Sequence, residues 1–114
     1  MSDFDKEDFV AAVHQMVKTV PYGRATSYGA IARAIGYPNM SRMVGKVMGN
    51  CSEVGVPAYR VVNGQGVLSG KDAFSTPTEM QEKLEKEGIR VENNRIKDWK
   101  KVFWNPLDEI LFVP

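Results

Sequence analysis

Two short helical patterns separated by a tight turn constrain the fold of this chain more than any other feature of its sequence. In residues 26–36 a threonine or serine can cap a helix, two isoleucines supply its apolar face, and a glycine ends it. A turn at residues 37–39 leads into the second pattern, residues 41–50, where Gly45 and Gly49 keep the helix slim. This arrangement predicts a helix-turn-helix, although any small helical hairpin gives the same signal.

The segments on either side predict further short elements around these two helices. An amphipathic helix is expected over residues 5–20, and a charged helix over residues 80–87. Residues 56–68 are typical of two short strands joined by a glycine turn at 63–66, a hairpin that would serve as a wing. Residues 89–96 predict a second short hairpin.

Together these elements predict an α+β, mostly helical fold: a winged helix-turn-helix domain over residues 1–106, followed by a C-terminal tail at 107–114. A length of 114 residues suffices for one modest core. The single cysteine, Cys51, excludes an internal disulfide and favours a reducing compartment. No signal peptide or apolar run of about 20 residues is visible. We therefore expect a cytoplasmic protein and no membrane partner.

Positive charge is concentrated in the middle of the chain. The formal net charge is only +1, but residues 9–71 contain seven lysines and arginines against one glutamate. Such a segment can build a phosphate-binding surface, although a merely solvated face gives the same pattern. There is no cluster of cysteines and histidines and no phosphate-binding glycine motif, so we expect no metal and no cofactor.

One segment of the chain resembles the active site of a known family. Residues 57–62, Pro-Ala-Tyr-Arg-Val-Val, are similar to the segment Pro-Cys-His-Arg-Val-Val of the O6-alkylguanine-DNA alkyltransferases, which take alkyl groups from guanine onto that cysteine. Residues 21–32 resemble the family's helix-turn-helix entry, 41–50 its recognition helix, and 84–88 its last helix. The resemblance covers roughly residues 5–106, and its motifs occur in the same order.

The residues around the reactive positions of the active-site segment are kept, but the reactive side chains themselves are replaced. Ala58 stands at the cysteine position, Tyr59 at the histidine position, and Gln81 aligns with the acid. Alkyl transfer needs a thiolate activated by a neighbouring base. The resemblance therefore implies an alkyltransferase-like protein that is not an enzyme, although homology alone would class it as a methylated-DNA–protein-cysteine methyltransferase. Such relatives usually have tryptophan where this chain has Ala58, and we expect the alanine to leave room for bulkier O6-alkyl groups.

The resemblance also implies DNA binding in the minor groove, with the recognition helix inserted and the damaged base rotated out of the stack. Arg42 would fill the gap left by the base, and Tyr28 would press on the adjacent phosphate. The implied DNA-binding residues are Tyr28, Ser41, Arg42, Gly45 and Lys46. The implied lesion pocket is lined by Val56, Pro57, Ala58, Tyr59, Val67, Leu68, Ser69 and Gly70. Two structural roles are implied: Asn50 would bridge the recognition helix to the pocket strand, and Arg60 would tie the pocket loop to the helix above it.

The implied function is recognition of O6-alkylguanine in double-stranded DNA without its repair, by a monomer that marks the lesion for nucleotide excision repair proteins. Two alternatives stay open. One is a winged-helix transcriptional regulator that reads undamaged sequence, and the other is an active alkyltransferase with an unconventional nucleophile. The tail has no counterpart in the family, and could cover the core or contact a partner.

Overall fold

The computed structural model describes residues 4–109, and its first element is the helix α1, Lys6–Lys18. Asp5 caps this helix, since its side chain accepts a hydrogen bond from the backbone N–H of Asp8 at 3.1 Å. Of the apolar residues expected on its inner face, Phe9, Val13, Val17 and Val20 are buried and Met16 is half-buried. The amphipathic pattern is therefore confirmed.

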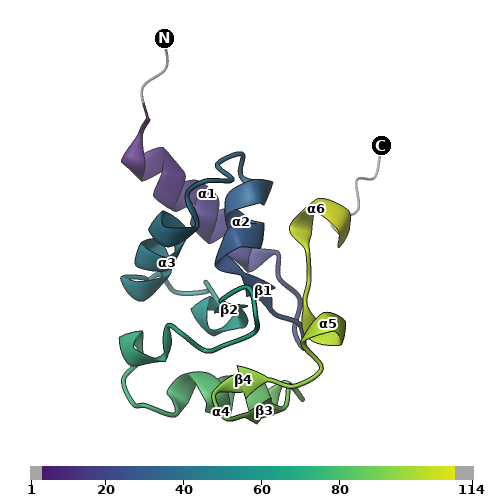
Figure 1. Ribbon diagram of the computed structural model, residues 1–114. Helices are drawn as coiled ribbons and strands as arrows, with labels where there is room; N and C mark the ends of the chain where they lie inside the picture. Colours follow the sequence, from purple (N-terminus) through teal and green to yellow (C-terminus); the bar gives the residue numbers. More distant parts are fainter. Residues whose placement is uncertain (1–3, 110–114) are drawn as a thin grey trace.

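The predicted helix-turn-helix is present. Its two helices are α2, Tyr28–Ala34, and α3, Ser41–Gly49, which pack against each other and against α1 in the upper half of the molecule (Figure 1). Ser27 caps α2, because its hydroxyl accepts a hydrogen bond from the backbone N–H of Ala30 at 3.1 Å. Gly36 follows the helix with a φ of +89°, a left-handed conformation that glycine adopts without strain.

The strand after the pocket segment pairs differently from the prediction. Strand β2, Val61–Val62, runs parallel to strand β1, Thr26–Ser27, in the middle of the molecule. The glycine turn exists, held by Asn63, whose Oδ1 accepts two backbone N–H bonds at 2.9 Å. Beyond it, however, Val67 bridges to Arg95, so the predicted wing hairpin over 56–68 was wrong. Both residues of β2 are buried, which favours a parallel strand covered by the core over one arm of an exposed hairpin.

The predicted late helix and second hairpin are both present in the lower half of Figure 1. The helix is α4, Glu79–Lys86, and the hairpin pairs β3, Val91–Glu92, with β4, Arg95–Ile96, in antiparallel register. The two asparagines between these strands have positive φ angles of 52° and 63°, as tight hairpin turns require. Two single 3-10 turns complete this half: η1, Ala58–Arg60, and η2, Lys71–Ala73.

The C-terminal part of the described chain lies along one side of the molecule as α5, Trp99–Val102, and α6, Pro106–Glu109. Helix α6 packs against α2, and Glu109 pairs with Arg24 at 3.1 Å. The expected boundary between residues 106 and 107 thus falls inside a packed helix. Residues 110–114 of the tail lie outside the described part, so the division into domain and tail stays a prediction.

Buried apolar side chains form two clusters. The first joins α1, α2 and α3, and the second lies between β2, α4 and the β3–β4 hairpin. The α+β, mostly helical class is confirmed. None of the helices in the described part of the chain is long and apolar enough to span a membrane. Within residues 4–109 no group of three or more histidine, cysteine or acidic residues could hold a metal ion.

Candidate DNA-binding groove and lesion pocket

A groove of about 890 Å³ runs between α2 and α3 on one side and α5 on the other. All five residues predicted to bind DNA line it: Tyr28, Ser41, Arg42, Gly45 and Lys46. The slim helix matters here, because a Cβ added at Gly45 would meet no atom within 4 Å. The middle of α3 therefore faces open space and can approach a partner closely.

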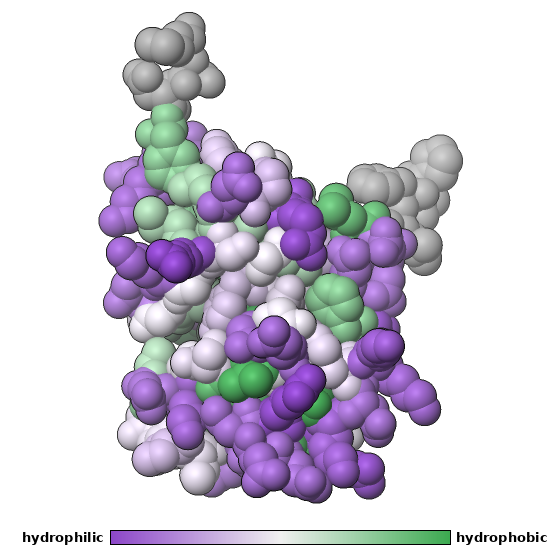
Figure 2. Space-filling model, in the orientation of Figure 1, coloured by the Kyte–Doolittle hydropathy of each residue, from purple (hydrophilic) through white to green (hydrophobic). Residues whose placement is uncertain are grey.

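The groove is positively charged. Arg33, Arg42, Lys46 and Lys100 line it with exposed side chains, and none of the described lining residues is acidic. None of these four cations takes part in an ion pair within residues 4–109. Figure 2 shows strongly hydrophilic side chains flanking a pale strip in the middle of this face. Unpaired cations around a weakly polar floor are suited to a phosphate backbone.

A second, smaller cavity of about 30 Å³ lies behind the groove, beside Ala58. Tyr28 and Gly45 line both spaces, so these two residues stand between them. The remaining walls of the cavity are mostly apolar and come from Met48, Gly49, Val61, Gly70, Phe74 and Met80. A cavity of this size holds about one water molecule. A purine can enter only if the walls move.

Only two of the eight predicted pocket residues, Ala58 and Gly70, line this cavity. Three others, Val56, Pro57 and Tyr59, line a separate hollow of about 360 Å³. The cause is η1: a 3-10 turn at Ala58–Arg60 directs successive side chains about 120° apart. A continuous strand, which the sequence favoured, would have alternated them between two faces.

The other three predicted pocket residues follow the glycine turn and also diverge. Leu68 is only 1% exposed and belongs to the second core cluster, and Val67 is held in its bridge to Arg95. Ser69 is exposed and lines neither the groove nor the cavity. The eight residues predicted for the lesion pocket therefore do not line one common cavity, and their role in holding a lesion stays a prediction. The cavity beside Ala58 is bounded mainly by helix α3 and residues 70–80.

Tyr28 occupies the passage between groove and cavity. A Cβ placed on Gly70 would lie 2.7 Å from the Tyr28 hydroxyl, so only a glycine there allows the ring its position. Burial raises the pKa of Tyr28, and the hydrogen bond with Ser69 opposes that shift only in part. The phenol therefore stays protonated and can donate to a phosphate at neutral pH.

The contacts of Arg60 agree with the structural role expected for it. Its guanidinium donates to the carboxylate of Glu87, with Nη2 to Oε2 at 2.8 Å, and to the carbonyl oxygen of Val20 at 2.9 Å. Glu87 also accepts hydrogen bonds from the Tyr59 hydroxyl at 2.6 Å and from the backbone N–H of Gly23 at 2.8 Å. This cluster joins η1 to the ends of α1 and α4.

Two sequence assignments are corrected by these contacts. The acid that faces Tyr59 is Glu87 and not Gln81, whose amide bonds Glu85 on its own helix at 3.2 Å. An acidic partner is therefore kept at this position. Asn50 likewise turns back on α3, donating to the carbonyl oxygen of Lys46 at 3.1 Å, and no hydrogen bond within residues 4–109 joins it to the pocket strand.

Replacing Glu87 with glutamine is expected to destabilise the protein by about 3 kcal/mol at pH 7, because it leaves the charge of Arg60 buried and unpaired. The side chains of Arg60 and Glu87 are only 14% and 3% exposed. Burial tends to raise the pKa of Glu87, but hydrogen bonds from Arg60, Tyr59 and Gly23 outweigh it and hold that pKa below its usual range. The stabilisation is thus present above a pH of about 4.3 and is lost as pH falls through the lowered value.

Urea unfolding of both proteins between pH 7 and pH 3 tests this expectation. The difference in unfolding free energy should shrink toward the acid end. Glu92→Gln is the matched control, since Glu92 is 64% exposed in its pair with Lys97 and should change stability little. Equal stability of the Glu87 variant and the control at pH 7 would show that the cluster does not hold η1 in place.

Several groove residues were not predicted from the sequence. They are Ser27, Gly29, Arg33, Asn63, Gly64, Trp99, Lys100 and Phe103. Arg33 is one of the seven basic residues in the segment 9–71, so the charge pattern could have indicated it. Trp99 and Lys100 are an aromatic and a basic residue that belong to none of the sequence motifs, and only the fold brings them opposite α3.

The slim helix of a helix-turn-helix, facing a groove with unpaired cations and no acid, defines a DNA-binding domain. Comparison with known protein families agrees with this class. The chain belongs to the O6-alkylguanine-DNA alkyltransferase family, since the model described as "6-O-methylguanine DNA methyltransferase, DNA binding domain" matches residues 8–89. The family resemblance inferred from the sequence is confirmed.

Similar proteins come from a yeast and a bacterium. Alkyltransferase-like protein 1 of Schizosaccharomyces pombe is 31% identical over 105 residues, covering 88% of this chain and 97% of that protein. The DNA base-flipping protein of Vibrio parahaemolyticus is 35% identical over 103 residues, covering 88% and 99%. The crystal structure of S. pombe Atl1 with damaged DNA containing O6-carboxymethylguanine matches with a TM-score of 0.81 at 30% identity, covering 90% of this chain and all of that one. The predicted fold class is confirmed by this likeness.

Proposed function

We propose that this protein binds double-stranded DNA containing O6-alkylguanine and holds the damaged base extrahelical without repairing it. The observation that carries the proposal is that the groove and the cavity adjoin each other: Tyr28 and Gly45 line both, and Ala58 lines the cavity only. A base leaving the stack beside α3 would therefore pass these two residues and reach Ala58. Relatives named for damaged-DNA binding and base flipping support this function.

Each groove residue has a role in this proposal. Helix α3 enters the minor groove, where Gly45 permits close approach and Lys46 neutralises a phosphate. Arg42 fills the gap in the stack, and the Tyr28 hydroxyl presses on the phosphate next to the rotated nucleotide. Extrusion costs a few kcal/mol and less for a poorly paired base, which favours O6-alkylguanine over guanine.

The positions of the family's cysteine and histidine carry no thiol and no imidazole. Ala58 has only a methyl side chain, and the Tyr59 hydroxyl is engaged with Glu87, which together with burial raises its pKa. Cys51 packs against the first core cluster and does not line the cavity. The protein therefore acts as a marker and dissociates unchanged. In this proposal it works as a monomer in the cytoplasm and presents the lesion to nucleotide excision repair proteins.

The cavity must enlarge when the base enters. Met48, Met80 and Phe74 form its apolar walls, and methionine side chains adapt their shape at low energetic cost. Alanine at position 58 adds no bulk to this space. We expect the site to accept O6-alkyl groups larger than methyl, and tighter binding of an O6-butylguanine duplex than of an O6-methylguanine duplex would agree. Equal affinity for the two would contradict a pocket that adapts to the alkyl group.

A titration of matched duplexes tests the function. The affinity for a duplex with one O6-methylguanine should exceed that for the undamaged duplex by roughly tenfold or more, at a fixed and stated salt concentration. After incubation, intact-protein mass spectrometry should show no added alkyl group. A stable mass increase would identify an active alkyltransferase instead. Discrimination among undamaged sequences with indifference to alkylation would identify a sequence-reading regulator.

A further inference from the structure

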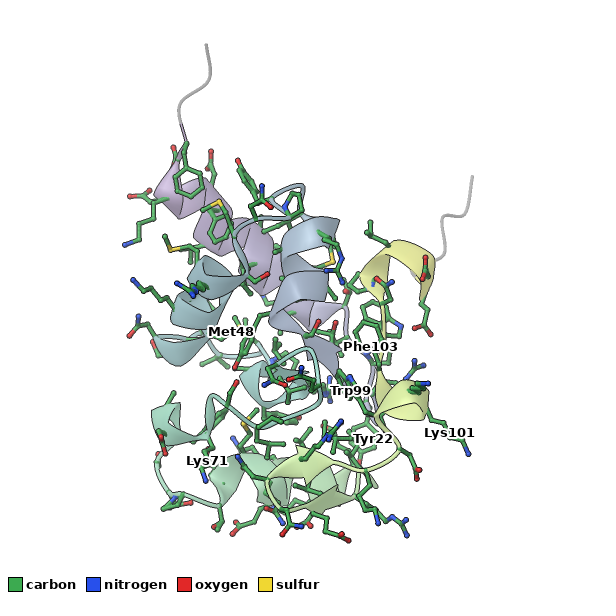
Figure 3. The ribbon with its side chains drawn as sticks, viewed as in Figure 1. Tyr22, Met48, Lys71, Trp99, Lys101 and Phe103 are labelled. Atoms are coloured by element: carbon green, nitrogen blue, oxygen red, sulfur yellow. The ribbon has the colours of Figure 1, made fainter. Side chains whose placement is uncertain are left out.

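The groove has a second wall, built by α5 and the residue that follows it. Trp99, Lys100 and Phe103 line this wall across from Arg42 and Lys46 of α3. The rings of Trp99 and Phe103 pack together, with centroids 5.2 Å apart and planes tilted by 44°. Figure 3 shows these two rings beside each other, whereas the adjacent Lys101 points outward, away from the groove.

The indole of Trp99 is fixed before any partner binds. Its Nε1 donates a hydrogen bond to the carbonyl oxygen of Gly64 at 3.0 Å. The ring lies directly over Gly66, where an added Cβ would come within 3.0 Å of it. Gly66 also has a φ of +82°, so this position requires glycine twice over. A ring held in this way loses little conformational freedom when it contacts a ligand.

The second wall is also fastened to the helix-turn-helix. The backbone N–H of Ala25 donates to the carbonyl oxygen of Val102 at 3.2 Å, and that of Trp104 donates to the carbonyl oxygen of Ala25 at 2.7 Å. Arg24 donates to the carbonyl oxygens of Val102 and Phe103 at 2.9 and 2.6 Å. The two walls of the groove are therefore held at a fixed separation by the residues just before α2.

We propose that α5 is a second DNA-contacting element: Lys100 pairs with a phosphate, and Trp99 and Phe103 pack on the sugars of the duplex whose minor groove receives α3. This inference rests on the proposed function. Charge supports it, because Lys100 adds to a groove with no acidic residue in its described lining, and Asp98 lines a different hollow. Flat aromatic faces beside cations are typical of surfaces that bind nucleic-acid backbones and bases.

Two neighbouring lysines provide a matched test. Lys100 and Lys101 are both exposed, but only Lys100 lines the groove. Lys100→Ala is expected to weaken binding of an undamaged duplex and of an O6-methylguanine duplex by the same factor, roughly fivefold. It should also reduce the slope of log affinity against log salt concentration by about 0.9, the value for one phosphate contact. Lys101→Ala should leave the affinity and the slope as in the wild-type protein.

Tryptophan fluorescence gives an independent readout. Trp99 is half-buried in the groove, whereas Trp104 is 5% exposed, so DNA should protect Trp99 from quenching by acrylamide. The protection should disappear in Trp99→Phe, which keeps an aromatic ring at this position. Suppose that the wild-type protein binds DNA, but the two lysine variants have equal effects and DNA does not protect Trp99. Then the proposal that α5 contacts DNA would be wrong, while the proposed function would stand. Absence of any DNA binding by the wild-type protein would overturn the proposed function itself.

Discussion

Gly45→Glu is expected to abolish DNA binding while leaving the protein folded. Gly45 lies in the middle of α3 and lines the groove, and a Cβ added to it would have no atom within 4 Å. Glutamate favours a helix interior over glycine by roughly 0.5–1 kcal/mol, so stability should be kept or raised. In the complex, however, its carboxylate would stand against the phosphates and next to Arg42 and Lys46. Like charges in contact cost several kcal/mol, and we expect affinity to fall about 100-fold or more.

Fluorescence anisotropy with a labelled O6-methylguanine duplex measures this loss, and circular dichroism verifies the fold. Ala11→Glu is the control for charge, because Ala11 is exposed on α1 and does not line the groove. Gly45→Ala separates bulk from charge and should reduce affinity less than glutamate does. Wild-type affinity of the Gly45→Glu protein would show that DNA does not approach α3.

Arg42→Ala is expected to remove the preference for damaged DNA. If Arg42 occupies the gap left by the rotated base, its loss destabilises the extrahelical state and weakens binding of the O6-methylguanine duplex by roughly 10- to 100-fold. Binding of the undamaged duplex should change little, because there the base stays stacked. Titrations of both duplexes at one salt concentration give the ratio of affinities directly.

Lys46→Ala is the comparison for this experiment, since Lys46 lines the same groove on the same helix. As a phosphate contact it should weaken binding of both duplexes alike and lower the salt slope by about 0.9. Arg42→Lys keeps the charge but loses the planar guanidinium, so it should behave like the alanine variant. If Arg42→Ala lowers the affinity for the damaged and the undamaged duplex by the same factor, Arg42 is also a phosphate contact and does not fill the gap.

Short-range patterns were sufficient for most of the secondary structure. The apolar spacing of α1, the serine before α2 and the glycine after it specify these helices through neighbours three or four positions away. The motif order was sufficient to identify the family, and it placed five DNA-contact candidates on one groove. Sequence patterns predicted the wrong secondary structure where the same residues are compatible with two backbone conformations. The segment around Ala58 was compatible with a strand, and it forms a 3-10 turn.

The sequence by itself determined the helix-turn-helix, the basic face and the absence of a thiol at position 58. Only the tertiary structure decided that Glu87 is the acid facing Tyr59, that the cavity beside Ala58 is bounded mainly by α3 and residues 70–80, and that α5 forms the opposite wall of the groove. The reason is the distance along the chain. Arg60 meets Glu87 across 27 positions and Trp99 meets Gly64 across 35, and no local periodicity specifies such pairs. They form because burial and hydrogen bonding select one packing of elements that are already specified locally.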